Sequence, residues 1–100
     1  MGWQAMADMK IEHEEGPSGG RYFVRKDGHE AEMTYSKAGD GIIIIDHTGV
    51  PTALGGQGIG QMLVQRGVED ARAAGKKIVP LCPYAKAQIE KHPEWQDVLR

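Results

Sequence analysis

Hydrophobic residues follow two different periods along the chain, and the change between them separates a strand-rich first half from a helix-rich second half. Residues 29–36 alternate between apolar and polar side chains, as an antiparallel strand does when one face is in solvent. Residues 10–14 and 21–25 also predict strands, and the pair Asp27 and Gly28 predicts a hairpin turn. Residues 42–45 are all isoleucine, which predicts a central strand covered on both faces.

Residues 59–74 have the period of an amphipathic helix. At about 100° per residue, one half of the helical wheel holds most of the apolar side chains and two glycines, namely Ile59, Leu63, Ala74, Gly67, Gly60, Ala71, Val64 and Val68. The other half holds Gln61, Arg72, Gln65, Glu69 and Arg66. Gly60 and Gly67 lie near the middle of the apolar half, although a glycine inside a helix costs about 1 kcal/mol relative to alanine. Their position predicts that the helix approaches the sheet closely.

Gly75 is expected to end this helix, and residues 76–82 predict the next strand. In such a β-α-β unit the two strands run parallel. Pro80 lacks the N–H group that a strand ladder needs, so this strand should lie at an edge or part from its neighbour near its end. Further helices are predicted over residues 83–92 and 94–99. The expected fold class is α/β (α+β), a mixed sheet with N-terminal antiparallel strands followed by the β-α-β unit and C-terminal helices.

The composition favours a small protein without an overall basic field. A chain of 100 residues with 40% hydrophobic content suits one domain, expected over residues 9–100, with residues 1–8 disordered. The formal net charge of −2 does not favour binding to nucleic acid or to an anionic membrane, and no apolar run is long enough to span a membrane. Cys82 is the single cysteine, which favours a reducing, cytoplasmic location, and neither it nor the scattered histidines predict a metal site.

The candidate catalytic and ligand-binding residues lie where the two predicted parallel strands end. His47, Thr48, Cys82 and the glycine-rich residues 55–60 should converge, because the strand ends and the helix N-terminus share one edge of the sheet. The N–H groups of such a loop, together with the helix dipole, form an anion site. The alternative is that the glycines only permit a tight turn. If the last strand parts early, the backbone of residues 48–50 lacks partners that a ligand with amides can supply.

Two common phosphate motifs do not fit this loop. A Walker A loop has a lysine after its last glycine, whereas Gln61 follows Gly60 here. A dinucleotide fingerprint needs a third glycine at the position that Leu63 occupies. The sequence therefore does not predict a nucleoside triphosphatase or a dinucleotide-binding enzyme.

A different family matches better. Residues 55–60, Gly-Gly-Gln-Gly-Ile-Gly, resemble the acetyl-CoA pyrophosphate loop of the GNAT superfamily of N-acetyltransferases. With His-Thr-Gly-Val-Pro at 47–51, Ile-Val-Pro-Leu-Cys-Pro-Tyr at 78–84 and His-Pro-Glu-Trp at 92–95, they resemble more narrowly the small stand-alone YjdJ-type GNAT-like family. One departure is Gly55, which stands where the superfamily pattern has Arg or Gln.

The resemblance implies a GNAT-like sheet, acetyl-CoA as cosubstrate and an amine as acceptor. It implies that the pantetheine arm pairs with the backbone of Thr48, Gly49 and Val50. It also implies that the pyrophosphate lies on the loop Gly55 to Gly60, held by the main-chain N–H groups of Gln57, Gly58, Ile59 and Gly60, with Gly56 as a further loop residue.

Three side chains near this edge are candidates for catalysis. Cys82 precedes a predicted helix N-terminus, which stabilises a thiolate, so it either attacks the thioester or lines the acetyl pocket; an inert buried cysteine is the alternative. His47 suits a general base for the amine, or it is structural. Tyr84 resembles the tyrosines that protonate the departing thiolate in larger GNAT enzymes, or it only packs. Glu30 and Glu32 either form a solvated strand face or attract a cationic amine.

The sequence thus predicts an acetyl-CoA-dependent N-acetyltransferase that acts on an unidentified amine, either directly or through acetylated Cys82. A non-catalytic acyl-CoA-binding or protein-interaction module is the alternative. In both cases CoA is the expected ligand, and nucleic acid, membrane and metal are not expected partners.

Overall fold

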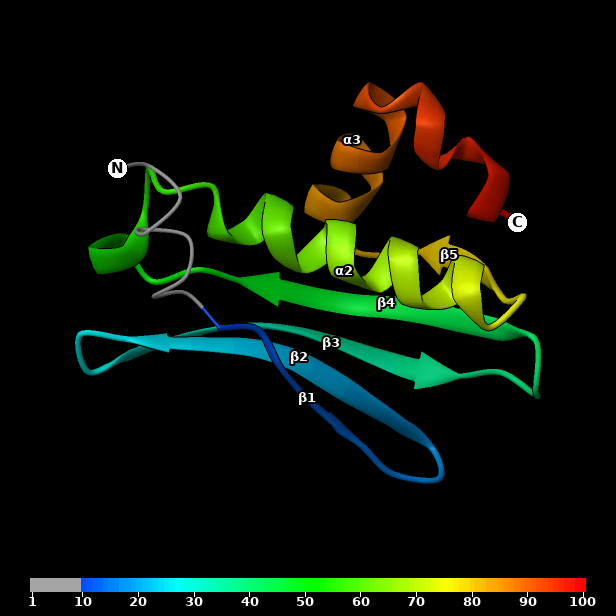
Figure 1. Cartoon of the computed structure of the whole chain (residues 1–100), viewed down its shortest axis with the longest axis horizontal. Coiled ribbons are helices and arrows are strands. Elements are labelled where there is room, and N and C mark those ends of the chain that lie inside the picture. Colours follow the sequence, from blue (N-terminus) through cyan, green and yellow to red (C-terminus); the bar gives the residue numbers. More distant parts are fainter. Residues whose placement is uncertain (1–9) are drawn as a thin grey trace.

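Five strands form one mixed sheet, and helices cover one of its faces (Figure 1). The computed structural model describes residues 10–100, so residues 1–8, expected to be disordered, lie outside the described residues. The strands lie side by side in sequence order. The first four pair antiparallel and the last two parallel, which confirms the predicted mixed sheet; their bounds are β1 Glu12–Glu15, β2 Gly19–Lys26, β3 His29–Lys37, β4 Ile42–Gly49 and β5 Lys77–Pro80.

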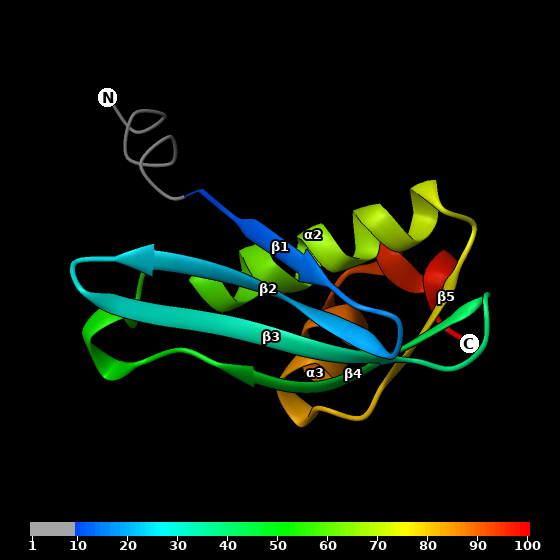
Figure 2. The ribbon, with the colours of Figure 1, turned by 90° about the horizontal axis from the view of Figure 1, so that it is seen from below.

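The helices lie on the same side of the strands in Figure 1, and the strands lie in front of them in the view from below in Figure 2. Their bounds are η1 Thr52–Leu54, α2 Ile59–Ala73, α3 Pro83–Lys91 and η2 Pro93–Val98. These bounds confirm the three predicted helices to within a residue or two. Gly75 follows α2 at φ 70°, the left-handed conformation of a helix-ending glycine.

The two glycines on the buried side of α2 make room for different neighbours. A Cβ at Gly67 would lie 2.8 Å from the terminal methyl of Met33, a buried side chain of β3. A Cβ at Gly60 would instead lie 2.6 Å from the hydroxyl of Tyr84, which belongs to α3. The predicted close approach of helix to sheet is confirmed at Gly67, whereas Gly60 accommodates a side chain from the other helix.

The isoleucine run of β4 is not covered on both faces, and that prediction is wrong. Only Ile45 is buried, and Ile42, Ile43 and Ile44 are half-buried. The helices pack on one face of the sheet, so the outer face of β4 has no layer above it (Figure 2). The run is explained by the preference of β-branched side chains for half-buried strand positions.

A bulge interrupts the pairing of β3 with β4. Tyr35 lies opposite Ile45, and Thr34 lies opposite His47, so β4 holds one extra residue, Asp46, between the two pairs. Because successive side chains alternate between the faces of a sheet, one extra residue moves every later side chain to the opposite face.

The bulge decides which side chains of β4 face the helices. Thr48 lies opposite Met33, which is buried under the helices, so Thr48 faces them too. His47 is the preceding residue and faces the outer side of the sheet. The carboxylate of Asp46 accepts a hydrogen bond of 2.6 Å from the hydroxyl of Ser36, which ties the bulged residue to β3.

β5 ends at Pro80, at the edge of the sheet, as predicted. The N–H groups of Leu81 and Cys82 both reach back to the carbonyl of Ile45 at 3.1 Å, and α3 begins directly afterwards. Because the last pair of the two strands is Ile45 with Pro80, β4 continues to Gly49 without β5 beside it. One edge of β4 is therefore open beyond its middle.

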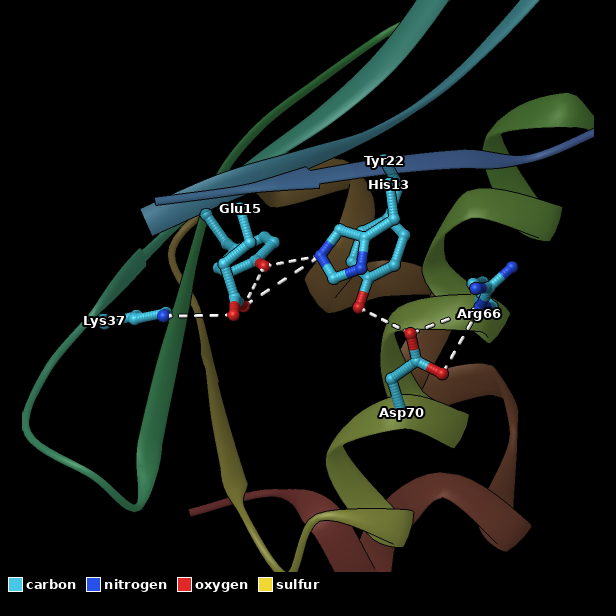
Figure 3. A network of polar contacts seen from close by, with 7 residues as sticks. His13, Glu15, Tyr22, Lys37, Arg66 and Asp70 are labelled. Carbon is cyan, nitrogen blue, oxygen red and sulfur yellow. Dashed lines mark hydrogen bonds and ion pairs between the residues drawn. The ribbon is translucent and has the colours of Figure 1, made fainter. Parts of the chain in front are cut away.

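A polar network joins the other edge of the sheet to α2 (Figure 3). The hydroxyl of Tyr22 donates to Asp70 of α2 at 2.8 Å, and the hydroxyl of Tyr35 donates to Glu15 at 2.5 Å and lies 2.6 Å from Nε2 of His13. Burial raises the pKa of both tyrosines, so their hydroxyls stay protonated and keep donating at neutral pH. This network anchors β1 and leaves the open edge of β4 untouched.

Candidate functional site

The loop between η1 and α2 leaves main-chain donors open. Gly56 and Gly58 are left-handed, at φ 76° and 73°, a conformation that residues with side chains rarely adopt. A Cβ at either position would have no heavy atom within 4 Å, so the space in front of the loop is empty. Gly58 is the N-cap of α2 and gives it no side-chain cap, and the first turn of the helix holds no acidic residue. The N–H groups there are available to an anion.

A hollow of about 280 Å³ lies in front of this loop. It is lined by the segment after β4, the glycine loop and one residue of α3, namely Val50, Pro51, Thr52, Leu54, Gly55, Gly56, Gly58, Ile59, Gly60 and Tyr84. The hydroxyl end of Tyr84 lies over Gly60, and Tyr84 is 40% exposed. Burial raises the pKa of Tyr84, with a smaller contribution from Cys82. The structure therefore brings the predicted loop and Tyr84 together.

Cys82 meets Thr48 where β5 leaves β4. The sulfur lies 3.5 Å from the hydroxyl oxygen of Thr48, and Cys82 is buried. Burial by itself raises the pKa of Cys82, but hydrogen bonds from the N–H group of Ala85, the Thr48 hydroxyl and the N–H groups of Tyr84 and Thr48 outweigh it. The pKa of the thiol is therefore lowered. Cys82 is the N-cap of α3, which explains why main-chain donors surround its sulfur.

His47 does not join Thr48 and Cys82. It faces the outer side of the sheet, where it lines a second hollow of about 360 Å³ with Glu30, Glu32, Gly49, Val50 and Pro51. Of the residues expected to converge, Thr48 therefore contacts Cys82 and the loop contacts Tyr84, whereas His47 lies on the other face of the sheet. Val50 and Pro51 line both hollows, so this short segment separates the loop side from the outer side.

Comparison with known proteins shows the family of this chain. The sequence profile described as GCN5-related N-acetyl-transferase matches residues 21–98. The chain belongs to this family. The NMR solution structure of a GCN5-like protein from Staphylococcus aureus, described there as a candidate N-acetyltransferase, is 37% identical in sequence. The match covers 95% of this chain and 91% of that chain with a TM-score of 0.72, which confirms the GNAT-like fold. No curated protein matches the chain.

The GCN5-related N-acetyltransferase family uses acetyl-CoA as its acetyl donor, so membership supports the predicted class of cosubstrate. Within residues 10–100, no helix is both long and apolar enough to cross a membrane. In the same part of the chain, no three His, Cys, Asp or Glu side chains are grouped so that they hold a metal ion. The expectations about metal, membrane and nucleic acid stay predictions.

In this GCN5-related N-acetyltransferase family member, the two carboxylates that line the outer hollow, Glu30 and Glu32, are paired with arginines. Arg21 donates to Glu30 at 2.8 Å and to Glu32 at 2.9 Å, and Arg25 donates to Glu30 at 2.9 Å. Hydrogen bonds from Arg21 and Arg25 lower the pKa of Glu30. Both guanidinium groups lie over the ring of Phe23, 4.1 Å and 4.8 Å from its centre. The two carboxylates are thus fixed in place by the guanidinium groups.

One side chain at the glycine loop, Lys26, was not predicted from the sequence. The ammonium group of Lys26, at the end of β2, donates to the side-chain oxygen of Gln57 at 2.6 Å. The two residues are 31 positions apart, so no local pattern reports the contact. Alternation along the strand could have indicated that Lys26 points toward the helix side of the sheet. Lys26 shares a strand face with Val24, which is buried on that side.

Proposed function

We propose that this protein transfers the acetyl group of acetyl-CoA to an amine, with CoA lying along the open edge of β4. The observation that carries the proposal is that one continuous segment joins two donor-rich places. At one end Thr48 and Cys82 meet, and at the other the loop and the first turn of α2 present their N–H groups. β3 pairs with one edge of Thr48 and Gly49, while β5 has already ended on the other.

This arrangement suits a long ligand with phosphate at one end. The backbone of Thr48, Gly49 and Val50 has the open edge that the amides of pantetheine require. The pyrophosphate would lie against the glycine loop, where Gly55 and Gly56 shape the turn and the N–H groups of four residues are the donors: Gln57, Gly58, Ile59 and Gly60. The hollow of about 280 Å³ is lined by Val50, where the first part ends, and by the glycine loop.

In direct transfer, the amine loses a proton and its nitrogen forms a bond to the thioester carbonyl carbon. The bond from that carbon to sulfur breaks, and the CoA thiolate leaves. His47 lies at the outer hollow and would accept the proton, because an imidazole suits this task near neutral pH. Burial raises the pKa of Tyr84, so its hydroxyl keeps a proton that it would donate to the leaving thiolate.

In the two-step route, the thiolate of Cys82 attacks the thioester and the CoA thiolate leaves. The amine then gives a proton to His47 and its nitrogen bonds to the acetyl carbonyl carbon on Cys82, and the carbon–sulfur bond breaks to restore the thiolate. The lowered pKa of Cys82 supports this route, since the thiolate is the nucleophile.

Titration calorimetry with CoA tests the binding step, and saturable heat is expected. No heat and no NMR shift at millimolar CoA would overturn the proposal. Intact-mass analysis after incubation with acetyl-CoA distinguishes the routes, because acetylation that disappears in Cys82→Ala supports the two-step route. CoA release with an amine but without a labelled enzyme supports direct transfer. Binding without label or CoA release across a panel of amines supports the non-catalytic module.

We also propose the narrower placement of the chain. It would belong to the small stand-alone YjdJ-type group, form one domain over residues 9–100 and act in the cytoplasm. The family match over residues 21–98 and the match to 91% of a small solved chain support the first two points. The single free cysteine supports the third.

A further inference from the structure

The hairpin between β2 and β3 reaches the glycine loop. Both lie at the same end of the molecule in Figures 1 and 2. Lys26 and His29 are the last paired residues before the turn, and the turn residues Asp27 and Gly28 have φ 52° and 77°. Two positive φ values are typical of the tight turn that matches the twist of a hairpin. Lys26 is therefore held on a rigid element, and its ammonium meets Gln57 at 2.6 Å.

The loop itself has no cationic side chain. Residues 51–61 contain neither lysine nor arginine, and Gly55 stands where a longer polar side chain is expected. Among residues 10–100, Lys26 is the cation whose side chain bonds to the loop. None of the salt bridges within this part of the chain involves Lys26, so no carboxylate there competes for its charge.

We propose that Lys26 provides the cationic contact to the pyrophosphate that the loop lacks, by exchanging the amide oxygen of Gln57 for a phosphate oxygen. This inference rests on the proposed function. A hydrogen bond between two charged groups is stronger than one to a neutral amide, so the exchange favours the bound ligand. The hydrogen bond to the neutral amide of Gln57 holds the Lys26 side chain near the loop before a ligand binds. This reduces the entropy lost when a phosphate binds.

The test compares the affinities of four variants and the wild type for CoA and for dephospho-CoA, which keeps the pyrophosphate and lacks the 3′-phosphate. Lys26→Gln should weaken both ligands about five- to tenfold, as expected for loss of one charged hydrogen bond. Lys26→Arg should restore most of the affinity. Lys76→Gln is the matched control, because Lys76 lies in the turn after α2 and should leave both affinities unchanged.

Gln57→Ala separates a ligand contact from a loop-holding contact, since it keeps the main-chain N–H group and removes the side-chain partner of Lys26. It should lose less affinity than Lys26→Gln. An equal or larger loss would show that Lys26 acts by holding the loop, and would overturn the inference. Unchanged affinity in folded Lys26→Gln, or a loss seen with CoA and absent with dephospho-CoA, would also overturn it while leaving the proposed function intact. Failure of the wild type to bind CoA would refute the proposed function itself.

Discussion

The change Gly58→Asp separates the anion site from the stability of the fold. Gly58 has φ 73° and open space around a built Cβ, so the new side chain meets no atom and only a backbone cost of about 1–2 kcal/mol remains. Gly39, in the turn between β3 and β4, has the same φ of 73° and the same open space. The turn between β3 and β4 lies at the opposite end of the sheet from the loop before α2 (Figure 1), which makes Gly39→Asp the matched control.

Compared with Gly39→Asp, the Gly58→Asp variant should be more stable and should bind CoA more weakly. A carboxylate at the N-terminus of α2 stabilises the helix by about 0.3–1 kcal/mol, so Gly58→Asp should be more stable than Gly39→Asp by that margin. The same carboxylate repels the ligand: at about 5 Å and an effective dielectric constant of about 40, two phosphate charges cost roughly 3 kcal/mol in all. That energy corresponds to roughly a hundredfold weaker Kd for CoA.

Denaturant unfolding and CoA titration on the same preparations measure both effects. The expected result is wild-type affinity with the lower stability for Gly39→Asp, and poor affinity with the higher stability for Gly58→Asp. A folded Gly58→Asp variant that binds CoA as the wild type does would refute the anion site. Equal losses of affinity in both variants would show that backbone strain, rather than charge at the loop, is responsible.

Two further predictions concern the thiol and the core. Because its pKa is lowered, Cys82 should reach its half-maximal rate of alkylation by iodoacetamide at a lower pH than in the denatured protein, and Thr48→Val should move this midpoint upward. Coinciding midpoints for native and denatured protein would contradict the donor arrangement. Gly67→Val should lower the free energy of unfolding by about 2–3 kcal/mol, because its Cβ would lie 2.8 Å from the methyl of Met33. The additional change Met33→Ala should cost less in this variant than in the wild type, and strictly additive losses would argue against the clash.

Local patterns predicted the elements whose environment is uniform along their length. The alternation of residues 29–36 matches β3, in which Ala31, Met33 and Tyr35 are buried and the residues between them are not. The apolar half of residues 59–74 matches the buried side of α2, because a helix that packs on a sheet must bury one continuous stripe. The isoleucine run failed as a guide because an apolar run does not say on which side helices will pack.

Contacts between distant side chains were beyond local patterns. Arg21 joins carboxylates on two neighbouring strands, and Lys26 crosses from a hairpin to a loop 31 positions away. Both depend on strand register and on where the hairpin tip lies, which a single sequence specifies weakly. The sequence placed Glu30 and Glu32 on one strand face correctly, and it gave no sign that two guanidinium groups hold them.

The bulge at Asp46 explains why His47 lies apart from Thr48 and Cys82, although all three lie near the ends of neighbouring strands. Strict alternation from buried Ile45 would turn His47 toward the helices, beside Cys82, and Thr48 toward the outer face. One extra residue reverses both, so Thr48 reaches the sulfur and His47 reaches the outer hollow. Under the proposed function, the thiol and the proton acceptor then lie on opposite sides of β4. The amine would approach from the outer face, while the CoA chain occupies the side of the glycine loop.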